Sequence, residues 1–328
     1  MTAPQGQKFS ERWREEGEMS PPAFGPLPGQ FIIKTYLKGN LITARDGGGH
    51  NRDALLTFAT TVGPNEKLQL GTLQPDFTTF TTFGGDLVTA VDGGGATAAA
   101  AAFDTTGRNL TDFGLFRIDG PSGDGVYTIS TWNGNFVTAL GGGGKSTEAF
   151  HTDARQASTW EYFYVLKSGD LGDGYNYAIR PAGTGFVPGQ GDNPRFISAT
   201  GGGGRIKDAM TSSTSVGRDE IFSVEKQPNG TYALRTATRN LVTAVGDGGM
   251  AHPTSTSDTL HTDATQIQAW ERFNIVERSP GLYGIQTGSG FWIGMDPQFK
   301  TFSTRIDPPE AAGSIGYTAL FEFMMIAP

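Results

Sequence analysis

The chain has 328 residues, a formal net charge of −8 at pH 7, 48 glycines and no cysteine. Without cysteine there is no disulfide framework, no thiolate nucleophile and no cysteine-ligated metal site. The acidic balance argues against nucleic acid as a partner. Because no apolar run approaches about 18 residues, we expect no membrane span.

Residues 1–28 precede any repeat and are predicted to form an N-terminal arm. Ser10 could cap a short helix through Glu18, with Phe9 and Trp13 near one face, before four prolines force an extended path. The arm is either a disordered leader or a docking segment for a filament or assembly protein. It lacks the apolar segment of a signal peptide, which leaves a cytoplasmic location or non-classical export.

One phrase recurs along the rest of the chain. Gly-Asn-Leu-Ile-Thr-Ala-Arg-Asp-Gly-Gly-Gly at 39–49 returns with small changes at 85–95, 134–144, 195–204 and 240–249, and in a worn form at 290–296. Its hydroxyl residues are spaced by 46, 49, 60 and 45; they are Thr43, Thr89, Thr138, Ser198 and Thr243. A period of this size is typical of a repeated supersecondary unit.

Each repeat has a second landmark, a short aromatic strand about 25 residues after the glycines. The sixth repeat keeps this strand although its glycine turn is lost, so the chain has six units. One apolar position recurs in all six strands and is predicted to face a barrel interior: Leu68, Phe116, Phe163, Phe222, Phe273 and Phe321.

The local pattern is all β. Alternating polar and apolar residues, rich in β-branched and aromatic types, are separated by turns that carry Gly, Asn and Asp. In the first unit we predict strands at 30–36, 40–45, 54–60 and 66–73, and we place 98–102 in a strand of the second. The glycine stretches are predicted to be hairpin tips that need positive φ, not phosphate-binding loops.

Four strands per unit and three units per domain match a β-trefoil, in which six strands close a barrel and three hairpins cover one end. The widest gap between units holds a natural boundary near residue 172. The predicted fold class is therefore all-β, with two tandem β-trefoil domains at 29–172 and 173–328 after the arm at 1–28.

Three motifs carry a family resemblance: Trp-Glu-x-Phe-x-(Ile/Val), Gly-x-Tyr-x-(Leu/Ile)-x-Thr and Gly-Asn-Phe-Val-Thr-Ala. The clearest copies are Trp160–Val165 and Trp270–Phe273, the latter followed by Gly281–Ile285. This pattern resembles the fascin-like β-trefoil repeat over roughly 29–328. The resemblance implies the trefoil fold, and it suggests one possible role, since eukaryotic fascins carry four trefoils and bundle actin.

Catalytic motifs are scarce: the four histidines form no metalloprotease motif, and no nucleophile elbow occurs. We therefore expect no enzyme activity, no cofactor and no metal site. The best local signal is His-Thr-Asp-Ala at 151–154 and again at 261–264, each His nine residues before a Trp. On a loop before the fourth strand, such a pair could bind a hydroxylated ligand; these candidates are His151, Asp153 and Gln156, with His261, Asp263 and Gln266. The alternative is a duplicated loop whose Asp caps a turn.

A second signal is a set of basic residues just beyond the glycine tips. They are His50, Arg52, Lys145, Arg205 and Lys207. Because the hairpins of one trefoil gather around its pseudo-threefold axis, these side chains and free backbone N–H groups could meet an anion. The alternative is ordinary solvated loop charge.

The sequence thus favours a non-catalytic, multivalent binding protein, with a glycan or polysaccharide as the expected partner. The rival class is a structural protein that cross-links filaments or packs into an assembly, as the fascin resemblance suggests.

Overall fold

The computed structural model describes residues 25–73, 77–182, 196–251, 258–296, 301–306 and 319–326. Over these residues the secondary structure is β, and the helical elements are three-residue 3-10 turns, so the predicted all-β class is confirmed. No helix in this described part is long and apolar enough to cross a membrane. The predicted arm lies outside it except for its last residues, where β1 (Gly25–Pro26) pairs with β5.

The chain divides into two compact units. The first takes the residues up to 119 together with 127–164, and the second takes 120–126 together with 165–327. The division between 164 and 165 falls inside strand β13 (Tyr162–Ser168), whereas we predicted a domain boundary after 172.

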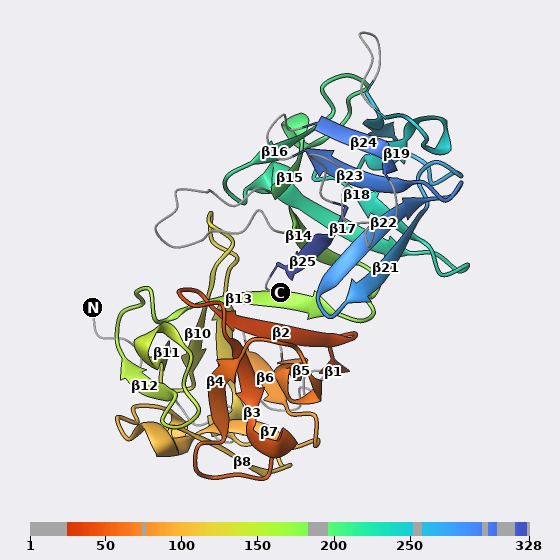
Figure 1. Ribbon diagram of the computed structural model, residues 1–328. Helices are drawn as coiled ribbons and strands as arrows, with labels where there is room; N and C mark the ends of the chain where they lie inside the picture. The colour runs from red at the N-terminus through yellow and green to blue at the C-terminus, as the bar shows by residue number, and fades with distance from the viewer. Residues whose placement is uncertain are drawn as a thin grey trace, which may run out of the picture. The chain divides into compact units, whose positions relative to one another are not determined.

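Six strands of the first unit pair in a closed ring, in the order β2-β5-β6-β9-β10-β13 and back to β2. They are β2 (Gln30–Thr35), β5 (Lys67–Leu73), β6 (Phe77–Thr81), β9 (Phe116–Asp119), β10 (Tyr127–Thr131) and β13 (Tyr162–Ser168). Three hairpins branch from this ring (Figure 1). They are β3 (Leu41–Ala44) with β4 (Leu55–Ala59), β7 (Leu87–Ala90) with β8 (Phe103–Gly107), and β11 (Phe136–Ala139) with β12 (Phe150–Ala154).

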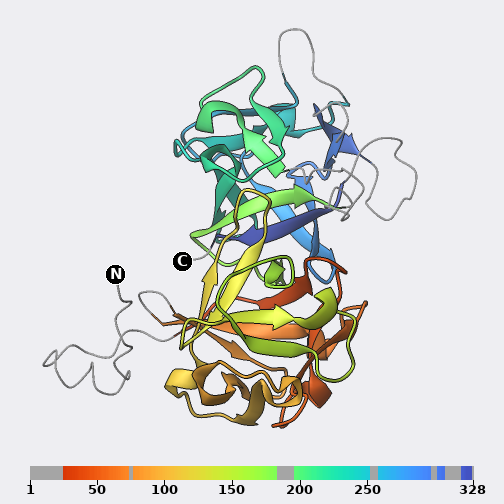
Figure 2. The same ribbon diagram turned by 90° about the vertical axis from the view of Figure 1, so that its left-hand side faces the viewer.

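The second unit repeats this topology in the ring β14-β17-β18-β21-β22-β25, drawn in green to blue in Figure 2. Its ring strands are β14 (Tyr175–Pro181), β17 (Ile221–Lys226), β18 (Tyr232–Arg235), β21 (Phe273–Ser279), β22 (Leu282–Thr287) and β25 (Phe321–Met325). Its hairpins are β15 (Phe196–Ala199) with β16 (Met210–Ser213), β19 (Leu241–Ala244) with β20 (Leu260–Ala264), and β23 (Trp292–Asp296) with β24 (Thr301–Ile306). The assignment of both units as β-trefoils stays a prediction.

The 3-10 turns fall at hairpin tips and before the fourth strands. They are η1 (Arg45–Gly47), η2 (Pro64–Glu66), η3 (Val91–Gly93), η4 (Ala99–Ala101), η5 (Asp112–Gly114), η6 (Leu140–Gly142), η7 (Thr200–Gly202), η8 (Arg218–Glu220) and η9 (Val245–Asp247). Turn η4 corrects our placement of 98–102 in a strand. Alanine is depleted in strands, and here the Ala101 N–H donates to the Ala98 carbonyl instead.

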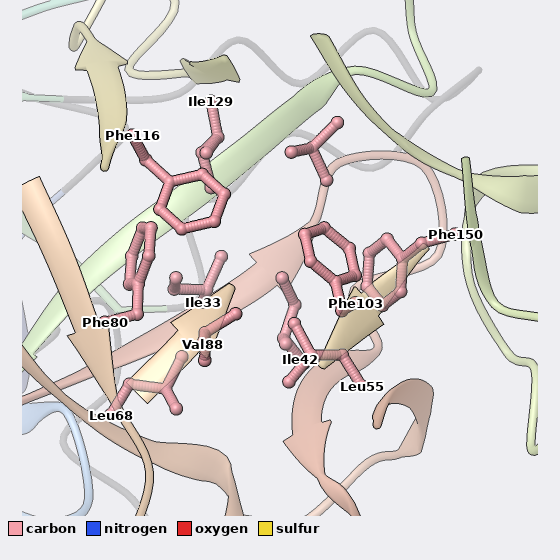
Figure 3. A pocket seen from close by; sticks show the side chains of 11 residues that line it. Ile33, Ile42, Leu55, Leu68, Phe80, Val88, Phe103, Phe116, Ile129 and Phe150 are labelled. Carbon is pink, nitrogen blue, oxygen red and sulfur yellow. The ribbon is translucent and has the colours of Figure 1, made fainter. Parts of the chain in front are cut away.

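The recurrent apolar position lies in the core as predicted. Leu68 and the five phenylalanines of that position are each at most 2% exposed. In the first unit the ring of Phe116 lies 5.2 Å from that of Phe80 on ring strand β6 and 6.3 Å from that of Phe103 on a hairpin, and the rings of Phe103 and Phe150 are 5.5 Å apart (Figure 3). The apolar space among these side chains is about 20 Å³. It is barrel packing and not a ligand pocket, since this volume holds about one water.

The glycine stretches are close-packed hairpin tips. Gly94 has a φ of 105°, and a Cβ atom there would lie 2.1 Å from Thr131 Oγ1 of the next repeat. A Cβ atom on Gly143 would likewise lie 2.6 Å from Thr35 Oγ1. Any larger residue would therefore push each tip away from the turn that follows it, and the glycines are explained by packing alone.

Candidate functional site

The two His-Thr-Asp-Ala segments lie on strands. We expected them on a loop before the fourth strand, but 151–154 belongs to β12 and 261–264 to β20, the third strand of each unit. The expectation was wrong because each segment pairs with the preceding strand. Thr138 lies opposite His151, and Thr243 lies opposite His261.

Both pairs face away from the barrel core. Phe150 and Val137 line the interior of the first unit, so strand alternation turns His151, Asp153 and Thr138 outward. The pairing slips between Phe136 and Thr138, and a bulge of this kind re-aims side chains on the longer strand. The same slip occurs in the second unit between Leu241 and Thr243.

The geometry is nearly identical in the two copies. The distance from His151 Nδ1 to Asp153 Oδ1 is 3.7 Å, and that from His261 Nδ1 to Asp263 Oδ1 is 3.8 Å. Both distances exceed the range of a hydrogen bond, so neither Asp carboxylate is hydrogen-bonded to the histidine Nδ1. The Asp side chains are 41% and 50% exposed, and the order of buried and exposed residues along 151–160 repeats along 261–270.

A buried glutamate supports each copy from the turn that follows. In the first copy, Glu161 Oε2 accepts hydrogen bonds from the Ser158 N–H at 2.8 Å and the Ser158 hydroxyl at 2.7 Å. In the second, Glu271 Oε2 accepts from the Gln268 N–H at 2.9 Å, and Oε1 accepts from the Thr243 hydroxyl at 2.8 Å. The latter bond ties the Trp-Glu turn to the strand opposite His261.

This glutamate is a structural part of the repeat. Glu66 Oε2 and Glu220 Oε2 accept from the N–H groups of Gly63 and Gly217, both at 2.7 Å, in units that have no His-Asp pair. The Trp-Glu motif by itself does not reveal this role. The only signal for it was the recurrence of Glu three residues after the N–H that it accepts.

Gln156 and Gln266 are exposed, each three residues beyond its Asp. The chain bends directly after the strand at both places. The structure thus places each glutamine just beyond the end of its site strand.

The basic residues beyond the tips divide between the units. His50, Arg52 and Lys145 lie in the first, and Arg205 and Lys207 lie in the second. His50 Nε2 lies 3.0 Å from the Asp46 carboxylate, and the Arg52 carbonyl accepts from the Arg45 side chain at 3.3 Å.

The backbone N–H groups expected to be free at the tips are already used. Those of His50, Lys145 and Arg205 donate to the hydroxyls of Thr105, Thr57 and Thr262, at 3.1, 3.2 and 3.2 Å. These bonds link each tip to the third strand of another hairpin in the same unit. An anion at the tips would therefore depend on the side chains alone.

One aromatic cluster had no signal in the sequence. The Arg117 guanidinium lies 4.8 Å from the centre of the Phe77 ring, and the Trp132 ring lies 5.1 Å from the same centre. The three residues come from separate strands and a turn, so only the folded pairing of β6, β9 and β10 brings them together.

A polar cluster in the second unit was also missed. Asp170 accepts hydrogen bonds from the Lys226 ammonium at 2.7 Å and the Tyr232 hydroxyl at 2.9 Å. Burial opposes its ionisation, but hydrogen bonds from Lys226, Gly172 and Tyr232 outweigh this and hold the Asp170 pKa at about 2. Burial lowers the pKa of Lys167 to about 7 although Asp170 and Glu277 favour its charged form. Among the described residues, no three His, Asp or Glu side chains group closely enough to hold a metal ion.

No protein-family model matches the chain, and no curated protein matches it. Among solved structures, the chain is similar to a designed three-fold symmetric protein, ThreeFoil, at 11% identity and a TM-score of 0.38, covering 42% of this chain and 97% of that one. It is also similar to a mosquitocidal holotoxin, at 8% identity and a TM-score of 0.37, over 90% of this chain and 34% of the toxin. SeviL bound to asialo-GM1 saccharide matches at 13% identity and a TM-score of 0.33, over 43% of this chain and 98% of that one.

Proposed function

We propose that the chain is a non-catalytic, bivalent carbohydrate-binding protein. Its two sites are the outer faces of the β11–β12 and β19–β20 hairpins. The observation that carries this proposal is the duplication of the His-Asp geometry, to within 0.1 Å in the Nδ1–Oδ1 distance, once in each unit.

The chemistry of each site suits a ligand rich in hydroxyl groups. An exposed carboxylate accepts charge-assisted hydrogen bonds from hydroxyls, and the neighbouring imidazole adds a donor or an acceptor. The net charge of −8 disfavours an anionic ligand and favours a neutral one. Neutral saccharides fit this description, and neither site contains a serine, cysteine or lysine beside the pair to serve as a nucleophile.

The scaffold is proposed to be two β-trefoils. In each unit, six strands close a ring and three hairpins accompany it, which is the strand count of that fold; in the second unit the β15–β16 hairpin forms a separate two-stranded sheet. A closed barrel has no sheet edge to protect and holds surface hairpins rigidly.

A structural or cross-linking protein is the second candidate, favoured by the same duplication. Two equivalent sites on two units can hold two partners at once, as a filament cross-linker requires. Under either proposed function, the basic residues beyond the tips are a second proposed site, for an anion.

A glycan array with the wild-type chain and the double variant Asp153→Ala/Asp263→Ala tests the first candidate. We expect saccharide binding by the wild type and its loss in the variant, with co-sedimentation against actin filaments run in parallel. Filament binding without saccharide binding would favour the cross-linker. Saccharide binding that survives in the double variant would move the site to His50, Lys145 and Arg205.

A further inference from the structure

The position directly before the recurrent glutamate differs among the repeats in a way that the fold does not explain. It holds Asn65, Trp160, Asp219 and Trp270 in the four units that have the glutamate, and Phe113 in the second unit, where Gly114 takes the place of the glutamate. The glutamate turn forms with Asn or Asp at this position, because Glu66 and Glu220 make the same backbone hydrogen bond as Glu161 and Glu271. The indole is therefore not needed to build the turn.

Tryptophan occurs at this position only in the third and fifth units, and only these units carry the His-Thr-Asp-Ala segment. They do not occupy equivalent places, since one is the last unit of its barrel and the other the middle unit. Two independent positions thus change together, which is expected when both serve one site.

Both indoles are exposed to an unusual degree for the largest apolar side chain. Trp160 is 42% exposed and Trp270 is 47% exposed, whereas Trp292 is 9% exposed. The backbone of each is fixed, because the carbonyls of Trp160 and Trp270 accept the N–H groups of Ala139 and Ala244, both at 2.9 Å. Each is a large apolar surface on an anchored backbone, open to solvent.

Two neighbouring residues of β11 relate the backbone of the tryptophan to that of the histidine. Ala139 holds the Trp160 carbonyl, and its neighbour Thr138 lies opposite His151 on the other side of β11. Because adjacent strands lie about 4.8 Å apart, the backbones of the tryptophan and the histidine are about 10 Å apart. This spacing suits a short saccharide lying across the strand.

We infer that Trp160 and Trp270 are the stacking walls of the two sites, and that the ligand is a cyclic sugar. Its apolar C–H face covers the indole while ring hydroxyls reach Asp153 or Asp263. This inference rests on the proposed carbohydrate binding and narrows it to saccharides with an intact ring, because an open-chain polyol has the hydroxyls but no flat apolar face.

The test follows the indole N–H resonances of the full chain by proton–nitrogen NMR during titration. D-glucose, D-galactose, D-mannose and N-acetylglucosamine are the probes, and sorbitol is the acyclic control. Trp160→Phe and Trp270→Phe assign the two signals, and the buried Trp292 signal serves as an internal control. We expect both site signals to shift saturably with at least one cyclic sugar, and neither to shift with sorbitol.

Variants complete the test. Trp160→Asn, which copies the first unit, should weaken the first site at least tenfold at an unchanged melting temperature, while Trp160→Phe should retain most of the affinity. Two outcomes would overturn the stacking inference and leave the proposed function intact. In the first, a sugar binds in a way that depends on Asp153 or Asp263 but the indole signals do not move. In the second, sorbitol shifts the indole signals as much as the cyclic sugars do. If no sugar binds even at concentrations high enough to saturate a weak lectin, both the stacking inference and the proposed function fail.

Discussion

The two units differ at one position in the first strand of each repeat. In the first unit it holds Phe31, Thr78 and Tyr127, and in the second it holds three tyrosines, Tyr177, Tyr232 and Tyr283. All six residues are buried. The same place in the repeat is thus filled by mixed side chains in one barrel and by three phenols in the other.

The hydroxyls of the three tyrosines donate hydrogen bonds to one segment of the chain. The Tyr177 hydroxyl donates to the Leu171 carbonyl at 2.5 Å, and the Tyr283 hydroxyl donates to the Gly169 carbonyl at 2.8 Å. The Tyr232 hydroxyl donates to the Asp170 carboxylate at 2.9 Å. Leu171 itself is 1% exposed. Segment 168–173 is therefore an integral part of the second barrel although it lies outside its three repeats.

A carboxylate also holds this segment. Glu277 accepts hydrogen bonds from the Ser168 hydroxyl at 2.7 Å and from the Gly169 N–H at 3.0 Å. Burial is the main reason that the pKa values of Tyr177 and Tyr283 are raised, and burial followed by the hydrogen bond to Asp170 raises that of Tyr232 to about 12. Two barrels with the same strand topology are therefore closed by different contacts. The second barrel adds the polar segment 168–173.

The largest expected effect comes from cutting that segment away. Fragments 165–328 and 173–328 differ only in it, and both lack 120–126, so the effect of that missing loop cancels. We expect the first fragment to melt cooperatively and the second to be strongly destabilised or unfolded, because it loses buried Leu171 and the acceptors of three tyrosine hydroxyls. Circular dichroism melting measures this. Equal stability would show that the segment is dispensable and would support a boundary at 173.

Core truncation should cost both units alike. Phe163→Ala in the first unit and Phe222→Ala in the second remove fully buried rings from the same position of the repeat. Each should lose roughly 3–5 kcal/mol of unfolding free energy, the usual range for a buried phenylalanine. Denaturant titration gives both values. A loss below about 1 kcal/mol at either site would show that its barrel is packed on other residues.

The pH dependence of stability should distinguish the second unit. The folded-state pKa of Lys167, about 7, lies below its ordinary value of 10.5, so the unfolded chain binds more protons between these limits. Stability should therefore rise with pH across this window, by at most about 1.4 kcal/mol per pH unit. Lys167→Met should flatten the rise. Met325 holds the equivalent place in the sixth unit and is buried, so methionine is a matched replacement. An unchanged slope in the variant would assign the rise to other groups.

Removal of single hydroxyls should have a smaller effect. Tyr283→Phe keeps the ring but leaves the Gly169 carbonyl without that donor, and a buried group so deprived costs about 1–3 kcal/mol. Tyr177→Phe should behave alike through the Leu171 carbonyl. Thermal unfolding of the single and double variants measures both losses. If the double variant were no less stable than wild type, the phenols would act by ring packing alone.

How far the sequence predicts this molecule depends on the range of each interaction. The period, the hairpin tips and the core positions are local patterns, and Phe116 or Gly94 could be placed from them. The phenol cluster was invisible because Tyr283 and Gly169 are 114 residues apart. The candidate residues His151 and Asp153 were put on a loop, because the pairing of 151–154 with the preceding strand leaves no mark in the residue types. The exposure of Trp160 was likewise unpredictable from the motif, since tryptophan before a buried strand reads as core.

The last prediction concerns binding and not stability, and it tests what the two units share. Asp153→Ala and Asp263→Ala each remove one exposed carboxylate from sites with the same geometry. A charged acceptor bonded to a ligand hydroxyl contributes about 1.5–3 kcal/mol, so each change should weaken its own site at least about tenfold. Because the sites lie on different units, the losses should be independent for a monovalent sugar. A multivalent glycan should lose more in the double variant than in either single one, because binding at one site raises the effective concentration at the other. Calorimetric titration of the four proteins with a monovalent and a multivalent form of one array-positive glycan measures this. If one single variant abolished monovalent binding entirely, only one unit would carry a working site, and the equivalence of the two hairpins would be structural and not functional.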